Sequence, residues 1–249
     1  MLNTNNLSLR EKLVLAGLYL SKFDKAGLKW LGFTSFTEAF NVIGYSLDSK
    51  PASIKNYRDE FDPLFPNNRV GWHHRPRRGY CTRILDKYRD MNIDSFANLL
   101  ISYTETGKSF VDPSEEPLGA SSFANRMITG LAAEHYFEQI QPELAPFKDY
   151  KITNTTRLGC GYDFHLITKI ENNFLAVEVK GLNETHGSLS LTSKEYDVAA
   201  KLKDKFCLFV VHNFREKPFH SIHMNPILSD LAFVKKERRV IQVNWSTNV

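Results

Sequence analysis

Three polar residues, Asp163, Glu178 and Lys180, are spaced so that they could meet on two neighbouring strands. Glu178 and Lys180 flank a single valine, so strand alternation places their side chains on the same face. Asp163 belongs to the preceding predicted strand, and pairing of the two strands would bring it to the same sheet edge. Two carboxylates at one point repel each other and resist desolvation unless a cation lies between them. The pattern therefore predicts a site for a hard divalent cation with oxygen ligands, which Mg²⁺ fits.

Beside such a cation, Lys180 could orient or activate a water molecule for in-line attack on a phosphorus atom. The same residues could instead form a structural cluster of ion pairs, and a Glu-x-Lys strand also occurs by chance. The context favours the catalytic interpretation, because Gly181 follows the lysine and a further helix and strand lie downstream.

The elements that must position these residues lie in the second half of the chain. A long helix there is apolar nearly all round, so we expect it to be buried. The remaining elements are strands, with one more helix that begins with a capping box. The predicted ranges are 122–140 for the long helix, 161–168 and 173–180 for two strands joined by a turn at 169–172, Thr192 to about Lys203 for the second helix, and 206–212 for a buried strand. Segments 152–156 and 239–245 are compatible with further strands, and this order predicts a mixed α/β fold.

The first hundred residues predict helices and turns only. Their boundaries follow from capping boxes and from prolines, which disfavour helical backbone in the preceding residue. The predicted helices begin at the capping boxes Ser8–Glu11 and Ser35–Glu38 (the second ending near Gly44), run between Pro51 and Pro63, and lie near 81–91 and 94–103. Residues 104–121 are rich in Gly, Pro, Ser and acidic residues, which is typical of a linker. We therefore predict a helical domain over residues 1–110 and an α/β domain over residues 122–249.

The α/β part resembles the PD-(D/E)xK nuclease superfamily, whose core is an Asp-x(n)-Glu-x-Lys pattern. Tyr162-Asp163 stands where the superfamily has Pro-Asp. Within the superfamily, a wider run of motifs is similar to the nuclease domain named after the C-terminus of the plant protein NO VEIN. Those motifs are Gly161-Tyr-Asp163, Glu178-Val-Lys-Gly181, Leu191-Thr-Ser-Lys-Glu195 and Phe209-Val-Val-His-Asn213. The resemblance covers roughly residues 122–225 and implies a restriction-endonuclease-like mixed sheet flanked by helices.

This resemblance also implies roles for single residues. Asp163 and Glu178, with the main-chain carbonyl of Val179, would bind Mg²⁺, and Lys180 would position the hydrolytic water. The family often supplies another acid from the helix before the strands. Glu134 fits that role better than its rival Glu138, because a carboxylate on so apolar a helix needs a partner or a metal. We expect Glu195 only to complete its capping box, with Thr192 as the N-cap.

The charge distribution singles out the first half of the chain. Residues 1–110 carry a net charge of +5 and residues 111–249 a net charge of −1, and residues 69–89 hold seven basic residues against one acid. Such a density attracts a phosphate backbone, although a solvated basic loop remains an alternative. The segment from Ser53 to Trp72 is similar to a helix-turn-helix-like module of some restriction-type proteins. Helical spacing also points Lys55, Asn56 and Arg58 outward, away from the apolar face of their helix. The DNA-binding residues that the similarity implies are these three, which would approach bases, and Arg69, Arg75, Arg77 and Arg78, which would hold phosphates or reach the minor groove.

Together these features predict a type II-like restriction endonuclease that cuts double-stranded DNA with Mg²⁺ and acts as a homodimer. One alternative is a nuclease of the same fold that depends on modified bases or defends against phage. The other alternative is a non-catalytic DNA-binding regulator with a degenerate nuclease fold. The intact Asp163, Glu178 and Lys180 argue against the regulator.

Other residue types narrow the class of protein. Three widely spaced cysteines form neither a disulfide framework nor a metal pair, which suits a prokaryotic cytoplasm. No membrane-spanning segment or signal peptide is predicted. The histidine spacings predict no zinc finger, and we expect His186, His220 and His223 to lie at the surface or in loops.

Overall fold

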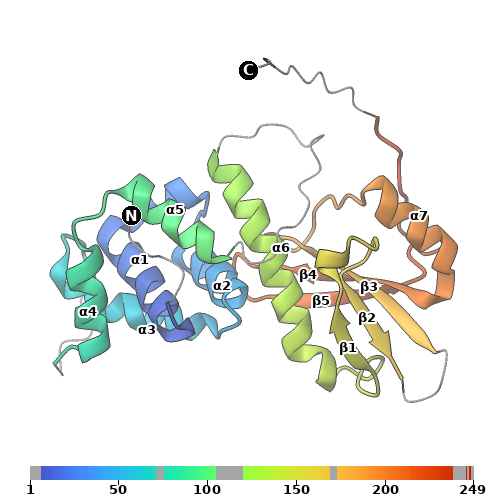
Figure 1. The fold of residues 1–249 in the computed structure, drawn as a ribbon, viewed down its shortest axis with the longest axis horizontal. Helices are drawn as coiled ribbons and strands as arrows, with labels where there is room; N and C mark the ends of the chain where they lie inside the picture. The colour runs from blue at the N-terminus through green and yellow to red at the C-terminus, as the bar shows by residue number, and fades with distance from the viewer. Residues whose placement is uncertain are drawn as a thin grey trace.

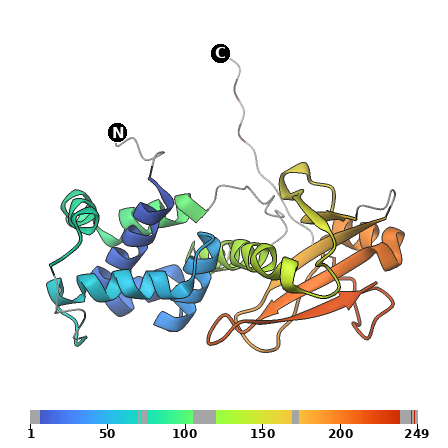
Figure 2. The same cartoon turned by 90° about the horizontal axis from the view of Figure 1, so that it is seen from below.

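The structure is a computed structural model that describes residues 7–69, 71, 76–104, 120–168, 173–237, 245 and 247. Figure 1 shows a bundle of helices on one side, a five-stranded sheet on the other, and α6 (Ala120–Ile140) between them. In Figure 2, which is turned by 90°, α6 is seen nearly end-on in the same intermediate position. The predicted mixed α/β fold with a helical N-terminal part is confirmed.

The other α-helices are α1 (Leu9–Leu31), α2 (Phe36–Ser46), α3 (Pro51–Phe61), α4 (Gly79–Tyr88), α5 (Ile93–Thr104) and α7 (Ser193–Leu202). The strands are β1 (Lys151–Asn154), β2 (Phe164–Ile167), β3 (Phe174–Gly181), β4 (Phe206–His212) and β5 (Phe219–Met224). Short 3₁₀ helices lie at Asp62–Leu64, Gln141–Glu143, Thr156–Leu158 and Lys203–Lys205.

Side-chain caps determine where several helices begin. At α1, the Ser8 hydroxyl accepts from the Glu11 amide and the Glu11 carboxylate accepts from the Ser8 amide, so the predicted capping box is complete. The second predicted box is only half formed. Ser35 caps α2, but the Glu38 carboxylate accepts from the amide and hydroxyl of Thr34 instead of the Ser35 amide. Helix α2 also continues to Ser46, past the predicted end.

The five strands lie in the order β1-β2-β3-β4-β5, and β3 and β4 pair in parallel while the other neighbours are antiparallel. Because parallel neighbours need a crossover, α7 connects β3 to β4. Leu175, Val177 and Val179 of β3 join the main hydrophobic core with residues of α6. Ala176 points to the other face, where it packs with Ala199 of α7 and Phe206. The sheet therefore has an α6 face and an α7 face.

The helical bundle and the sheet share one hydrophobic core that runs through α6. Tyr45 of α2 stacks edge-on against Tyr136 of α6, with ring centroids 5.3 Å apart. The side-chain amide of Asn41 donates to the carbonyls of Phe214 and Glu216 just after β4, at 2.7 and 2.8 Å. These contacts join the two predicted domains. Most of the predicted linker, residues 105–119, lies outside the described residues.

The sheet differs from the sequence prediction at two strands, β2 and β5. β2 is shorter than the predicted 161–168, because Gly161 and its neighbours form a bend before Phe164. The second difference is β5, since His220 and His223, expected in loops or at the surface, lie in a strand that pairs with β4. The predicted turn at 169–172 and all but Trp245 of the predicted strand 239–245 fall outside the described residues.

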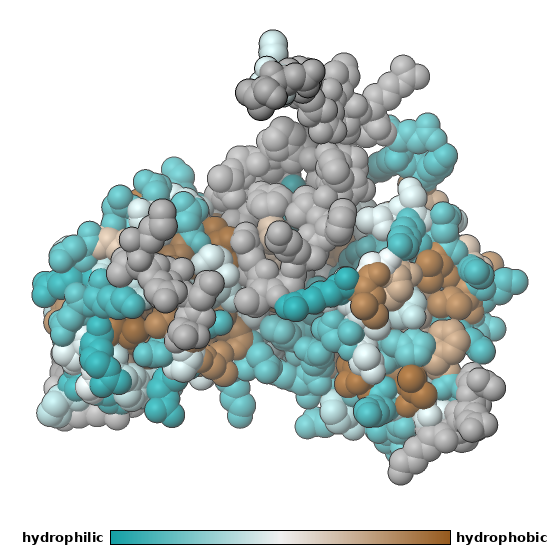
Figure 3. Space-filling view, viewed as in Figure 1, coloured by the Kyte–Doolittle hydropathy of each residue, from teal (hydrophilic) through white to brown (hydrophobic). Residues whose placement is uncertain are grey.

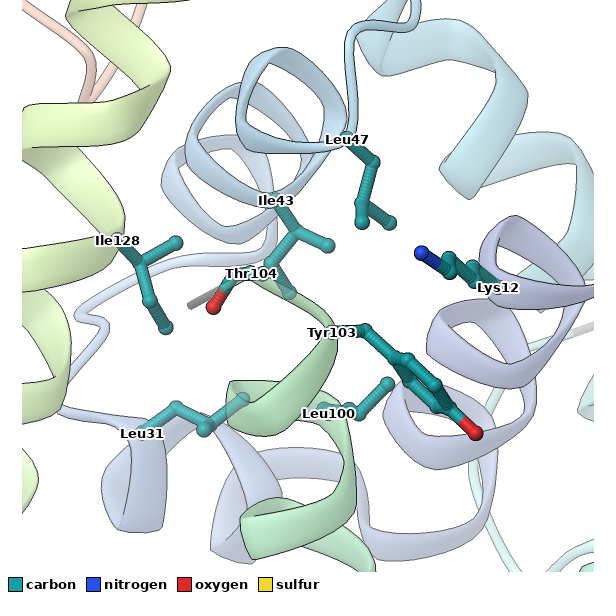
Figure 4. A pocket seen from close by; sticks show the side chains of 8 residues that line it. All are labelled: Lys12, Leu31, Ile43, Leu47, Leu100, Tyr103, Thr104 and Ile128. Carbon is teal, nitrogen blue, oxygen red and sulfur yellow. The ribbon is translucent and has the colours of Figure 1, made fainter. Parts of the chain in front are cut away.

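On the face shown in Figure 3, hydrophilic and hydrophobic residues are interspersed. Within the described part of the chain, no helix is both long and apolar enough to cross a membrane. A small apolar pocket opens where α1, α2, α5 and α6 meet (Figure 4). Its one charged group, the Lys12 ammonium, lies 5.2 Å from the centroid of the Tyr103 ring. The other lining groups are mainly hydrocarbon, so the pocket offers little for chemistry.

Candidate active site

Strand β3 places Glu178 and Lys180 on the α7 face of the sheet. The two side chains form an ion pair, with 2.6 Å between Lys180 Nζ and Glu178 Oε1. This contact confirms that strand alternation brings them to one face. Glu178 is only 2% exposed, and its second oxygen, Oε2, is buried without a hydrogen-bond partner among the described residues. A buried carboxylate oxygen without a partner is costly, so it marks a place where a cation would be favoured.

Asp163 reaches the same place from the bend immediately before β2. Its amide donates to the Val177 carbonyl at 3.0 Å, and its carboxylate accepts from the Val179 amide at 2.8 Å. The bend needs Gly161, which has φ +90°, and a Cβ there would lie 2.9 Å from Val198 of α7. The sequence thus brings Asp163 next to β3 through a tight turn and not, as predicted, from within a strand.

Helix α7 adds a carboxylate to which the sequence prediction gave only a capping role. Glu195 does complete the capping box with Thr192. The same oxygen, Oε2, also accepts from Lys180 Nζ at 3.0 Å. Lys180 is therefore held between Glu178 and Glu195. In the sequence, the one indication was that Glu195 lies in the capping motif of the helix that follows Lys180. Spacing alone could not show that the first turn of α7 faces β3.

Glu134 of α6 lies near enough to the site to interact with it electrostatically. Burial raises the pKa of Glu134 to about 8, and the negative charges of Asp163 and Glu138 add to this effect. Lys180 opposes it. The structure thus brings Glu134 into the electrostatic environment of the predicted site. No hydrogen bond or ion pair of the Glu134 side chain is recorded within the described residues.

The site holds more buried carboxyl groups than its one lysine can pair with. Burial raises the pKa of Asp163 to about 6, although Lys180 and the Val179 amide act in the opposite direction. Burial and the charge of Asp163 raise the pKa of Glu178 well above its ordinary value. For Lys180, burial favours the neutral form, but Glu178 and Glu195 outweigh it and raise the pKa. Desolvated carboxylates with raised pKa values are typical of functional sites that bind cations.

The residues present fit the predicted Mg²⁺ ligands in kind. Mg²⁺ takes oxygen ligands, and Asp163 and Glu178 offer carboxylate oxygens. Within the described part of the chain, Glu178 Oε2 has no hydrogen-bond partner. Val179 lies between them, with its amide bonded to Asp163. Across the ranges that the structure describes, no three Asp, Glu, His or Cys side chains are grouped as a metal site. A metal here would therefore depend on two carboxylates, a main-chain carbonyl and water molecules.

The predicted base-contacting residues of α3 are only partly accessible. The prediction that Arg58 points outward is wrong. Its side chain is buried, pairs with Asp59 at 2.7 Å, and lies over the rings of Phe36 and Phe40. Lys55 and Asn56 are exposed as predicted, and Lys55 forms an ion pair with Asp59 at 2.8 Å. The reason is that one face of a short helix cannot hold every polar residue, and Arg58 lies toward the core.

The predicted phosphate-contacting arginines are also largely occupied within the bundle. Arg69 pairs with Asp62, at 2.8 Å, and with Asp24. Arg78 pairs with Glu60 and lies over the ring of Tyr57. Arg77 is half-buried, with its Nε lacking a partner among the described residues, and Arg75 lies outside them. Much of the predicted basic charge is thus balanced by buried acids of α3 and the turn after it.

Comparison with known families gives one match. Residues 131–224 match the family described as Protein NO VEIN, C-terminal. The matched range begins within α6 and ends with β5, so it contains the whole sheet and every acidic residue of the site, together with Lys180. No curated protein and no solved structure matches the chain. The chain is therefore similar to the NO VEIN C-terminal family over its α/β part.

Proposed function

We propose that this chain is a Mg²⁺-dependent nuclease that hydrolyses phosphodiester bonds in DNA. The observation that carries the proposal is the excess of buried carboxyl groups around Lys180, above all Glu178, whose Oε2 has no hydrogen-bond partner among the residues that the structure describes. The likeness of residues 131–224 to the NO VEIN C-terminal family supports it, because that range contains the site. The arrangement also agrees with the PD-(D/E)xK pattern of the sequence.

Each residue of the site has a role in this proposal. Asp163 and Glu178, with the Val179 carbonyl, would hold Mg²⁺, which when bound supplies a Lewis acid and an acidified water. Lys180 is held in place by two carboxylates and carries a positive charge, so it orients the attacking water as a hydrogen-bond donor. Glu195 fixes the position of Lys180, and Glu134 adds a further carboxyl group beside the metal ligands, whose ionised form a bound cation would favour.

We further propose a restriction-type action on double-stranded DNA, in which two copies of the chain cut the two strands. Base contacts would come from the exposed Lys55 and Asn56 of α3. A nuclease that depends on modified bases would use the same site on a different substrate. A DNA-binding regulator would retain the fold but cleave nothing.

The test is cleavage of supercoiled plasmid, unmethylated and methylated, with Mg²⁺ or with EDTA. We expect nicked or linear DNA only with Mg²⁺. Asp163→Asn, Glu178→Gln and Lys180→Met should each lower the rate by about 100-fold or more. The first two weaken a ligand of Mg²⁺, and the third removes the donor that orients the water.

Matched controls are Asp197→Asn and Lys201→Met. They remove one negative and one positive charge, as the site variants do, but at exposed positions of α7. Both should cleave as the natural chain does. If the natural chain cleaves neither plasmid, the nuclease proposal fails and the regulator is favoured. If Lys180→Met and Asp163→Asn retain cleavage, the site is placed wrongly.

A further inference from the structure

A second row of polar side chains lies on the α7 face of the sheet, two strands from Lys180. In the register, Lys180 of β3 is opposite Val210 of β4, and Val210 is opposite Ser221 of β5. Residues opposite each other share a face, so Ser221 lies on the same face as Lys180, at roughly 10 Å for two strand spacings. His212 of β4 and His223 of β5 belong to this face by alternation.

The three side chains form a continuous hydrogen-bonded row. His212 Nε2 is 2.9 Å from Ser221 Oγ, and Ser221 Oγ is 2.9 Å from His223 Nε2. The other ring nitrogen of His212, Nδ1, is 3.0 Å from the Thr185 carbonyl. All three side chains are half-buried. We refer to His212, Ser221 and His223 as the His-Ser-His row.

The carbonyl of Thr185 determines the direction of these hydrogen bonds. A carbonyl only accepts, so His212 Nδ1 carries the proton. Burial lowers the pKa of His212, which favours the neutral ring, so its Nε2 accepts from the Ser221 hydroxyl. Ser221 Oγ then accepts from His223 Nε2. The row ends at Nδ1 of His223, for which no partner is recorded within the described residues.

His220, which precedes Ser221 in β5, has a packing role on the opposite face of the sheet. His220 stacks on Phe209, with ring centroids 5.1 Å apart, and lies against Tyr136 of α6. It is part of the packing on the α6 face. The row cannot be explained in the same way, because its members are hydrogen-bonded to one another in a line that ends at a ring nitrogen without a recorded partner in the described ranges. Nor does it form a metal site, since the described residues include no group of three suitable ligands.

We propose that the His-Ser-His row binds a backbone phosphate of the DNA a few nucleotides from the one that is cleaved. This inference rests on the proposed nuclease function. A phosphate oxygen only accepts hydrogen bonds, so His223 would donate to it from Nδ1 while its Nε2 donates to Ser221 Oγ. DNA advances about 3.4 Å per nucleotide along its axis, so the row would meet a phosphate within about three nucleotides of the cleaved bond.

The test measures binding separately from cleavage. A labelled DNA duplex is titrated with protein in EDTA at several salt concentrations, and the affinity is followed by fluorescence anisotropy. His223→Gln removes the charged donor, so we expect about 10-fold weaker binding and a salt dependence reduced by about one phosphate contact. Ser221→Ala removes only the group that orients His223, so we expect about 3-fold weaker binding.

The matched control is His220→Phe, which keeps a ring on the opposite face of the same strand. Its affinity and salt dependence should equal those of the natural chain. The inference is overturned if His223→Gln keeps the natural salt dependence, or if His220→Phe loses as much affinity. Thermal unfolding confirms that each variant is folded, and Ser221→Ala preserves the test should His223→Gln not fold. If the natural chain shows these binding effects but never cleaves plasmid, the nuclease proposal fails while the phosphate contact stands.

Discussion

The molecule buries carboxylates in two regions, the helical bundle and the α7 face of the sheet, and it surrounds them differently. In the bundle, the fully buried side chain of Asp62 accepts two hydrogen bonds from Arg69 and one from Ser21, each at 2.8 Å. At the sheet, Glu178 is almost as buried, but one of its oxygens has no partner within the described residues. The bundle therefore satisfies its buried acids and the sheet does not.

The pKa values of the buried carboxyl groups also differ between the two regions. For Asp59 and Glu60 of α3, burial alone would raise the pKa, but hydrogen bonds and charges from Lys55, Arg58 and Arg78 lower it below the ordinary value. At the sheet the carboxylate pKa values are raised instead. Paired acids stabilise a fold, whereas acids in excess of their cations call for a cation from solution.

This comparison also explains why the basic residues of the first half are weak candidates for DNA contact. Arg58, Arg69 and Arg78 are basic in the sequence, yet each is paired with a buried acid in the bundle. Their positive charges are already paired with these acids inside the folded protein. A phosphate would have to compete with a carboxylate that is already in place.

The largest expected effect on stability is in the bundle. Asp62→Asn should lower the free energy of unfolding by about 3 kcal/mol, because it removes a fully buried carboxylate from Arg58 and Arg69. Among the described residues, these arginines then keep only Asp59 and Asp24 as ion-pair partners. Urea denaturation measures the change. Asp86→Asn, at an exposed position of α4, serves as the control and should change the stability by less than about 0.5 kcal/mol. A loss as small for Asp62→Asn would mean that the bundle does not depend on this pairing.

The second prediction concerns cation binding at the sheet. Mg²⁺ at one hundred times its Kd should stabilise the natural chain by about 2.7 kcal/mol, seen as a rise in Tm. Without Mg²⁺, Glu178→Gln should change the Tm little. It removes the ion pair with Lys180, which keeps Glu195, but it also removes an oxygen that has no partner among the described residues. With Mg²⁺, the same variant should gain little. Equal Mg²⁺ stabilisation of Glu178→Gln and the natural chain would contradict the site.

A smaller effect on the free energy of unfolding should follow when the pH is lowered. The pKa of Glu60 is lowered from 4.5 when the chain is folded, so its ion pair stabilises the protein above about pH 4.5. As the pH falls below 4.5, the unfolded chain takes up the proton first and about 1.5 kcal/mol is lost, a low value because Arg78 stays partly exposed. Urea denaturation from pH 6 to pH 3 measures this loss. Glu60→Gln should start less stable and lose less on acidification.

The parts of this molecule that follow local rules could be predicted from the sequence. Alternation along β3 placed Glu178 and Lys180 together, and the capping boxes at Ser8 and Thr192 begin helices as expected. These features depend on residues within one element. The helix predicted at residues 122–140 was expected to be buried, and over 126–140, where the structure describes the side chains, all but Arg126 and Gln139 are buried or half-buried.

What could not be predicted depends on contacts between elements. Arg58 was expected outward, but Phe36 and Phe40 of α2 lie under it. β5 was missed because its histidines and serine suggest a loop, and only pairing with β4 makes it a strand. Glu195 was expected to do no more than cap a helix, because nothing in the sequence says which way the start of α7 faces.

The smallest effect we predict separates the two roles of Glu195. Thr192→Ala removes the N-cap of α7 and should cost about 1 kcal/mol of stability, as measured by urea denaturation. Glu195→Gln keeps an oxygen for the Thr192 amide, so it should cost less than that. It nevertheless takes one of the two carboxylates from Lys180. If Glu195 positions Lys180, then Glu195→Gln lowers the rate of plasmid cleavage by about 10-fold while Thr192→Ala, though less stable, does not. If the two variants lose cleavage in proportion to their loss of stability, Glu195 is only a cap.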